Sequence, residues 1–119
     1  MASIEESLEN IMAVDGAIAA ALVDSTSGFV LCWSGDDFDM DTAGAGSTEL
    51  VRAKLNTVKA LKLNDMIEDI LITMGRQYHI IRPVARNPDL FLYLVLDKAR
   101  SNLAMARKFA ANVETEMFN

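Results

Sequence analysis

Few side chains in this 119-residue sequence have the types and spacing that catalysis or metal binding requires. The single histidine, His79, follows Tyr78 in a segment with the composition of a strand, so a structural role is favoured over that of a general base. Cys32 has no second cysteine as a partner and is expected to be a small core residue. The sequence contains no nucleophile elbow, phosphate-binding glycine loop or zinc-ligand spacing. We therefore expect no catalytic residue, no cofactor and no metal site, and an enzyme is the least favoured class.

One acidic segment partly matches a calcium-binding loop. Asp37, Asp39 and Asp41 have the spacing of the first three ligands of an EF-hand, but the glycine and glutamate required further along that loop are missing. Together with Asp36, these carboxylates are expected to form a solvated loop that leads into a helix. Asp36, Asp37 and Asp39 are also candidates for contact with a protein partner, whose choice this loop could influence.

The charges are unevenly distributed along the chain. Residues 1–50 carry ten acids and no Lys or Arg, whereas residues 51–119 carry seven acids and eleven bases. The net charge of −6 disfavours binding to nucleic acid or to an anionic membrane. There is no apolar run of the roughly 18 residues that span a bilayer, and no basic N-terminal region of a secretory signal. We expect a cytoplasmic protein whose separated charges either steer a protein partner or only maintain solubility.

Hydrophobic periodicity and turn chemistry predict the elements that position these residues. Ser3 and Glu6 fit a capping box, and Gly75 suits a type II′ hairpin turn. The expected elements are a helix up to Gly16, strands at 17–23 and 29–34, a helix at 41–63, strands at 65–74 and 77–84, a turn at 86–89, a strand at 90–96 and a helix from Asp97 to Phe118. The order αββαβββα and the continuous apolar run at 90–96 indicate a single α+β domain over residues 1–119, with a five-stranded antiparallel sheet and helices on both faces.

The strand expected at residues 65–74 predicts a homodimer. Residues 70–74 contain no Lys or Pro, so at a sheet edge this strand would lack the usual protection against pairing. An antiparallel copy across a two-fold axis would give one ten-stranded sheet, with the preceding helix beside its symmetry mate. The expected interface residues are Ala43, Gly46, Ser47, Val51, Leu55, Val58, Ile70, Ile72 and Met74. The alternative is that these residues pack only on the sheet of their own chain.

The element order and several motifs resemble the roadblock/dynein light chain family. The supporting residues are Val14-Asp15-Gly16-Ala17, Asp24 with Ser27-Gly28, the run Phe91–Asp97, and Asn102–Arg107 in the last helix. The resemblance covers nearly the whole chain and implies a profilin/roadblock-like fold, as in bacterial stand-alone roadblock domains. It also implies a homodimer formed through the second helix and the third strand, which correspond here to residues 41–63 and 65–74.

The resemblance further implies a non-catalytic regulator of a small Ras-like GTPase. Some bacterial members accelerate GTP hydrolysis without supplying an arginine finger, and Arg52, Arg76 and Arg86 are the residues that could in principle reach a γ-phosphate. Two alternatives remain open. The protein could be a scaffold or adaptor in a signalling or motility complex, or a small-molecule sensor whose seven methionines line an adaptable pocket.

Overall fold

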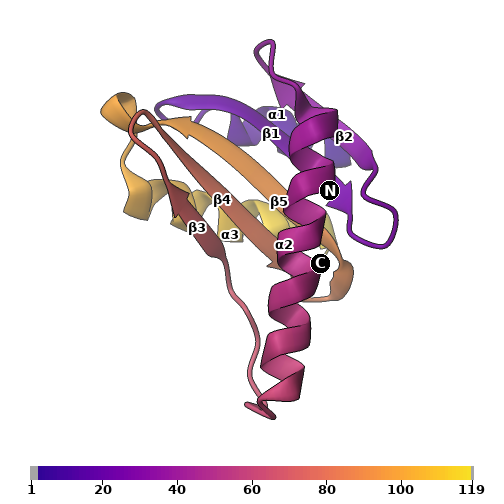
Figure 1. The fold of residues 1–119 in the computed structure, drawn as a ribbon. Coiled ribbons are helices and arrows are strands. Elements are labelled where there is room, and N and C mark those ends of the chain that lie inside the picture. The colour runs from indigo at the N-terminus through magenta and orange to yellow at the C-terminus, as the bar shows by residue number, and fades with distance from the viewer. Residues whose placement is uncertain (1–2, 119) are drawn as a thin grey trace.

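A computed structural model describes residues 3–118, which form one antiparallel sheet with helices on both faces (Figure 1). Its elements are α1 (Ile4–Ile11), β1 (Ala17–Asp24), β2 (Val30–Gly35), α2 (Met40–Ala60), β3 (Ile70–Thr73), β4 (Gln77–Val84), β5 (Asn87–Asp97), the 3₁₀ helix η1 (Lys98–Arg100) and α3 (Leu103–Phe118). The five strands lie in the order β2-β1-β5-β4-β3. This confirms the predicted α+β class and element order.

Two apolar layers hold the helices on the sheet. On one face α1 and α3 pack on alternate residues of β5, including Leu92, Leu94 and Leu96. On the other face α2 packs on the residues between them, including Phe91 and Val95. Because β5 lies at the centre of the sheet and both its faces are covered, its apolar residues are continuous rather than alternating.

The first helix begins where the capping box predicts and ends earlier than expected. Ser3 Oγ accepts a hydrogen bond from the Glu6 N–H at 3.1 Å. The helix ends at Ile11, and the following N–H groups bond to carbonyls three residues back, as in a tightening last turn. Gly16 therefore does not stop the helix. It has a φ of 81°, and a Cβ at this position would lie 2.2 Å from Ser101 Oγ, so it allows a close chain crossing.

The predicted third strand is wrong in length. It comprises Ile70–Thr73 rather than residues 65–74, because the β4 residue after Ile81 and Arg82 is Pro83, which has no N–H to continue the ladder beyond Ile70. Just before the strand, both oxygens of Asp69 accept hydrogen bonds from Arg107 of α3, at 3.0 and 3.1 Å.

Other boundaries also differ from the sequence expectations. The last helix is interrupted: the Asp97 carboxylate caps η1 through the Ala99 N–H, and Asn102 caps α3 through the Met105 N–H. Gly75 lacks the positive φ of a type II′ turn. The strand predicted at 90–96 begins at Asn87, so the expected four-residue turn is a two-residue connection. The second helix runs from Met40 to Ala60 and is capped by Asp39.

Among residues 3–118, no helix combines the length and the apolar character that crossing a bilayer demands.

Candidate functional site

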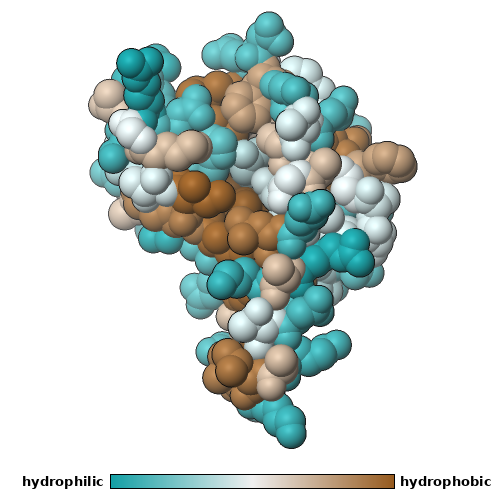
Figure 2. Space-filling view, viewed as in Figure 1, coloured by the Kyte–Doolittle hydropathy of each residue, from teal (hydrophilic) through white to brown (hydrophobic). Residues whose placement is uncertain are grey.

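An apolar surface lies where α2, β3 and the segment between them meet. We call this surface the α2–β3 face. Its apolar members are Leu55 and Val58 of α2, Met66 and Ile67 of the connecting segment, and Ile70 and Ile72 of β3. Figure 2 shows apolar residues gathered between β3 and α2, and a second apolar group at the far end of α2. Exposed Leu61 and Leu63 account for apolar surface beyond the helix.

The position of α2 produces this exposure. The helix crosses the sheet, and its C-terminal part extends past it, so the chain returns through residues 61–69 to reach β3 (Figure 1). A groove of about 730 Å³ lies between the helix, this segment and Pro88, with Leu55, Val58 and Met66 among its lining. Sequence reasoning missed Leu61, Leu63 and Met66 as surface residues, although three large apolar side chains around a helix end were a usable signal.

β3 is an edge strand with half of its backbone groups directed outward. It pairs with β4 alone, from Ile70 opposite Ile81 to Thr73 opposite Tyr78. The Met74 N–H donates to the Gln77 carbonyl at 2.9 Å. Since antiparallel pairs alternate, the N–H and C=O groups of Leu71 and Thr73 are the ones that point away from β4. The exposed edge that the sequence predicts is therefore present, but over four residues.

The small residues of α2 have two different environments. A Cβ on Gly44 would lie 2.9 Å from Val30 Cγ2, so Gly44 allows the helix to approach β2 closely. A Cβ on Gly46 would meet nothing within 4 Å. Gly46 thus faces open space, beside partly exposed Ala43 and Ser47.

The nine residues predicted for the dimer interface divide into two groups. Val51 is 0% exposed and packs on its own sheet, so its side chain has no surface left for a second copy. The other eight are partly or fully exposed. Ile70 and Ile72 also pack against the core beneath α2, so they contribute to the subunit itself as well as to the α2–β3 face.

A row of hydrogen-bonded polar side chains lies beneath this face. His79, directly opposite Ile72, has its Nδ1 2.6 Å from the Tyr93 hydroxyl and its Nε2 2.9 Å from Gln77 Oε1. A neutral ring that donates from Nε2 and accepts at Nδ1 fits both contacts. Burial lowers the pKa of His79 and raises the pKa of Tyr93, the latter effect being opposed by Ser47. Because both ring nitrogens have partners within the fold, the structure supports the structural role predicted for the histidine.

The candidate partner-contacting residues lie at two ends of the sheet. Asp36, Asp37 and Asp39 follow β2 and are exposed at the end where Arg76 joins β3 to β4. Arg86 lies at the opposite end of β4, about 26 Å away along eight residues of strand.

Arg52 belongs to the same end of the sheet as Arg86, because it lines a hollow together with Thr26 and Pro88. The structure therefore does not bring the three arginines together.

Cys32 is partly exposed and packs against the layer that α1 and α3 form. Burial raises the pKa of the Cys32 thiol, and the Glu5 and Glu9 carboxylates raise it further. This environment favours the less reactive thiol form. No group of three or more His, Cys, Asp or Glu side chains within residues 3–118 could hold a metal ion.

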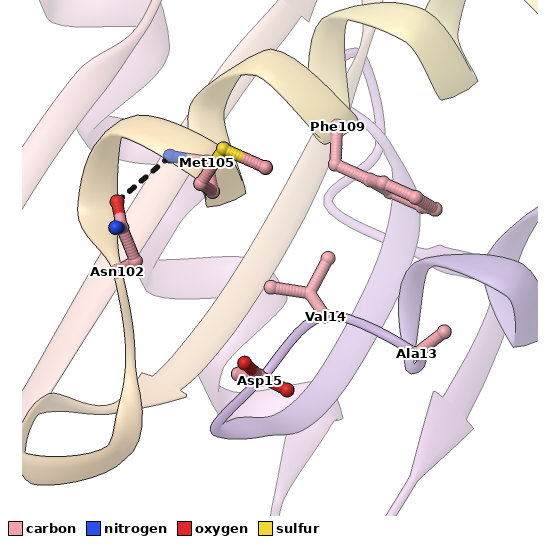
Figure 3. Close-up of a pocket in the computed structure, with 6 residues that line it drawn as sticks. All are labelled: Ala13, Val14, Asp15, Asn102, Met105 and Phe109. Atoms are coloured by element: carbon pink, nitrogen blue, oxygen red, sulfur yellow. Dashed lines mark hydrogen bonds between the residues drawn. The ribbon is translucent and has the colours of Figure 1, made fainter.

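A smaller hollow of about 280 Å³ lies on the other side of the molecule, between α3 and the loop before β1. Figure 3 shows Met105 and Phe109 of α3 above Val14 and Asp15 of that loop. Asn102 also borders it, but its side-chain oxygen accepts from the Met105 N–H at 3.1 Å and caps α3. The lining offers one carboxylate and mostly apolar atoms, which is little polar chemistry for holding a small ligand.

Comparison with known proteins gives matches at the level of structure. No protein-family model matches the sequence, and no curated protein matches it. The fold is similar to that of a Roadblock/LC7 domain from Streptomyces avermitilis, at 11% identity and a TM-score of 0.81, over 97% of this chain and 94% of that one. It is also similar to Myxococcus xanthus MglB, at 16% identity and a TM-score of 0.82, over 95% and 89% of the two chains.

A third similar structure is the gliding protein MglB from Thermus thermophilus, at 21% identity and a TM-score of 0.70. That match covers 93% of this chain and 87% of the other. Likeness at these identities defines the fold alone.

Proposed function

From the premise that this chain has the roadblock fold, we propose that it is a cytoplasmic, non-catalytic regulator of a small Ras-like GTPase and that it acts as a homodimer. The observation that carries the proposal is the α2–β3 face, where an unpaired strand edge lies beside exposed apolar side chains. An uncovered surface of this kind in a small protein indicates a protein-binding site.

In the proposed dimer, two β3 strands pair antiparallel across a two-fold axis and continue the sheet from one subunit into the next. The outward N–H and C=O groups of Leu71 and Thr73 form the new ladder. The α2 helices then lie on the same side of the joined sheet, where Gly46 and Ala43 allow close approach. The interface comprises the eight exposed residues of the predicted set and excludes Val51.

Regulation by binding, rather than by an inserted arginine, is supported by where the charges lie. Arg76 and Arg86 are at opposite ends of β4, so one subunit could not present both to a single bound nucleotide. The partner-contacting residues proposed at one end of the sheet are Arg76, Asp36, Asp37 and Asp39, and those at the other are Arg52 and Arg86. Such a surface could hold the switch segments of a GTPase in place without itself supplying a catalytic group.

The test uses small Ras-like GTPases from the same organism, loaded with GTP, and compares single-turnover hydrolysis with and without this protein. Thr73→Pro removes one outward N–H of β3 and no hydrogen bond to β4, while Thr73→Val retains that N–H and serves as the control. Light scattering gives the oligomeric state of each variant. We expect the wild type and Thr73→Val to be dimers and Thr73→Pro to be a monomer. The two dimers should change the GTP hydrolysis rate about tenfold or more, and the monomer should leave the rate unchanged.

The outcomes distinguish the alternatives. Formation of a complex on a sizing column without a change in hydrolysis rate would identify a scaffold. A rise in melting temperature with a metabolite, in the absence of any GTPase complex, would favour a sensor. If no GTPase forms a complex or changes its rate, the proposal is wrong.

A further inference from the structure

The opposite edge of the sheet carries a second group of exposed apolar side chains. β2 is the edge strand at that side, and Phe29, Leu31 and Trp33 are 72%, 55% and 48% exposed. Single exposed apolar residues are common on protein surfaces, but here three lie within five residues, with Phe29 directly before β2 and Leu31 and Trp33 within it. We call these three residues the β2 strip. Natural sheets usually protect such an edge with Lys or Pro, and β2 contains neither.

The backbone of β2 is available on its outer side. The Asp36 N–H donates to the Ile18 carbonyl at 2.9 Å. Because antiparallel pairs alternate, every second residue of β2 before Asp36 points its N–H and C=O groups toward β1, and the residues between them point these groups away from it. Gly35 and Trp33 are the outward members, opposite Ala19 and Ala21. Within residues 3–118, the outward N–H and C=O groups of these two residues have no hydrogen-bond partner.

A bulge explains why one of these side chains is displaced outward. The pairing of β1 with β2 shifts between Leu22 and Val23, which are opposite Cys32 and Val30. Leu31 is the extra residue and has no opposite neighbour in β1. Val30 and Cys32 pack on the two layers of the core, which leaves Leu31 outside them.

The surroundings of the β2 strip are acidic. Glu5 and Glu9 of α1 are close enough to raise the pKa of the Cys32 thiol, in the middle of β2. Exposed Asp36 and Asp37 follow the strand directly.

Within residues 3–50 there is no Lys or Arg to balance these carboxylates. Arg52 of α2 lies beside Thr26, near the other end of β2.

We propose that the β2 edge binds an extended segment of a partner protein that carries apolar side chains at alternate positions and Lys or Arg between them. The segment would add a sixth strand to the sheet through its own backbone, which supplies affinity without a deep pocket. Its apolar side chains would contact Trp33 and the displaced Leu31, and its bases would lie near the four carboxylates. A second copy of this chain fits less well, because pairing two β2 edges would bring together two regions that contain only acidic charges.

This site is independent of the proposed dimer. β2 and β3 are the two opposite edges of one sheet, so a partner strand on β2 leaves the α2–β3 face free. The inference also does not depend on the GTPase proposal, since it concerns different residues and a different type of contact.

The test uses Trp33, the single tryptophan of the chain, as a fluorescent reporter. The probe is a short synthetic peptide that alternates valine and lysine, and the matched control alternates valine and glutamate. We expect the lysine peptide to shift Trp33 emission to shorter wavelength, because the indole leaves water. The glutamate peptide should bind at least about tenfold more weakly, and added salt should weaken binding of the lysine peptide.

Two protein variants place the binding on one edge. Leu31→Lys changes an exposed side chain of β2 and should reduce affinity for the lysine peptide about tenfold or more, through lost apolar contact and charge repulsion. Thr73→Pro alters the other edge and should leave the affinity unchanged. The proposal is overturned if neither peptide binds, if both bind equally, or if Leu31→Lys binds as well as the wild type.

Discussion

His79 illustrates how one buried side chain couples the fold to pH. Both of its nitrogens have partners, and burial lowers its pKa from the ordinary value of 6.5. In the unfolded chain the ring returns to that value, so on acidification the unfolded state binds a proton before the folded state does. Stability is therefore lost as the pH falls below about 6.5 and becomes constant again below the folded pKa.

We predict that the melting temperature measured by calorimetry falls between pH 7 and pH 5, and that His79→Gln shows less of this fall. Asp24 and Asp39 should not interfere in this window. Hydrogen bonds from Thr26 and Thr42 hold the pKa values of Asp24 and Asp39 below 3.8, so the stability that these two groups contribute is lost only at lower pH. An identical pH dependence in the wild type and His79→Gln would show that the ring is not buried as described.

The role of His79 was predictable from sequence, but only one of its two partners was. A lone histidine between apolar strand residues indicates a structural position. Gln77 lies two residues away on the same face of β4, a spacing that the period of a strand makes visible. Tyr93 is fourteen residues further along the chain, and only the register of β4 against β5 brings its hydroxyl to Nδ1.

At the scale of elements, the contact of α2 with the sheet depends on Gly44. A Cβ there would lie 2.9 Å from Val30 Cγ2, which is closer than side chains tolerate without a shift of the helix or strand. We predict that Gly44→Ala lowers the free energy of unfolding by about 1–3 kcal/mol, although alanine is the better helix former. Urea denaturation measures this change.

Gly75→Ala is the matched control, because a Cβ on Gly75 meets nothing within 4 Å and the residue has no positive φ. Its effect should stay within about 0.5 kcal/mol. If the two variants are equally stable, the helix does not approach β2 as closely as described.

Local signals predicted the elements, while distant contacts set several of their boundaries. The strand Gln77–Val84 was predicted residue by residue, and β1 to within one residue, because turn residues flank both. The third strand was predicted too long because its end depends on Pro83, a residue of the neighbouring strand. The break before α3 arises from Asn102, a local capping residue that competes with the cap at Asp97.

The same distinction applies to the candidate surfaces. The sequence indicated an exposed edge near Ile70, and the α2–β3 face has that edge. It did not indicate that β2 is the opposite edge, because this depends on β5 inserting between β1 and β4. The buried position of Val51 and the separation of Arg76 from Arg86 likewise follow from how α2 and β4 lie in three dimensions.

At the scale of the whole molecule, the sheet has two open edges with different surroundings. The β3 edge lies beside apolar residues of α2 and suits a second copy, whereas the β2 edge lies beside carboxylates and suits a basic segment. A dimer joined through β3 would have its two β2 edges at the far ends of the continuous sheet. The proposed dimer is therefore a platform with a central interface between copies and one peripheral docking strand in each subunit.

The most direct test of the central claim is amide hydrogen exchange measured by NMR on the wild-type protein at high concentration. If β3 pairs with a second copy, the outward amides of Leu71 and Thr73 are hydrogen bonded and should exchange slowly, while those of Trp33 and Gly35 on the free edge should exchange quickly. Dilution should accelerate exchange at Leu71 and Thr73 alone. Rapid exchange at Leu71 and Thr73 that does not change with protein concentration would contradict the account.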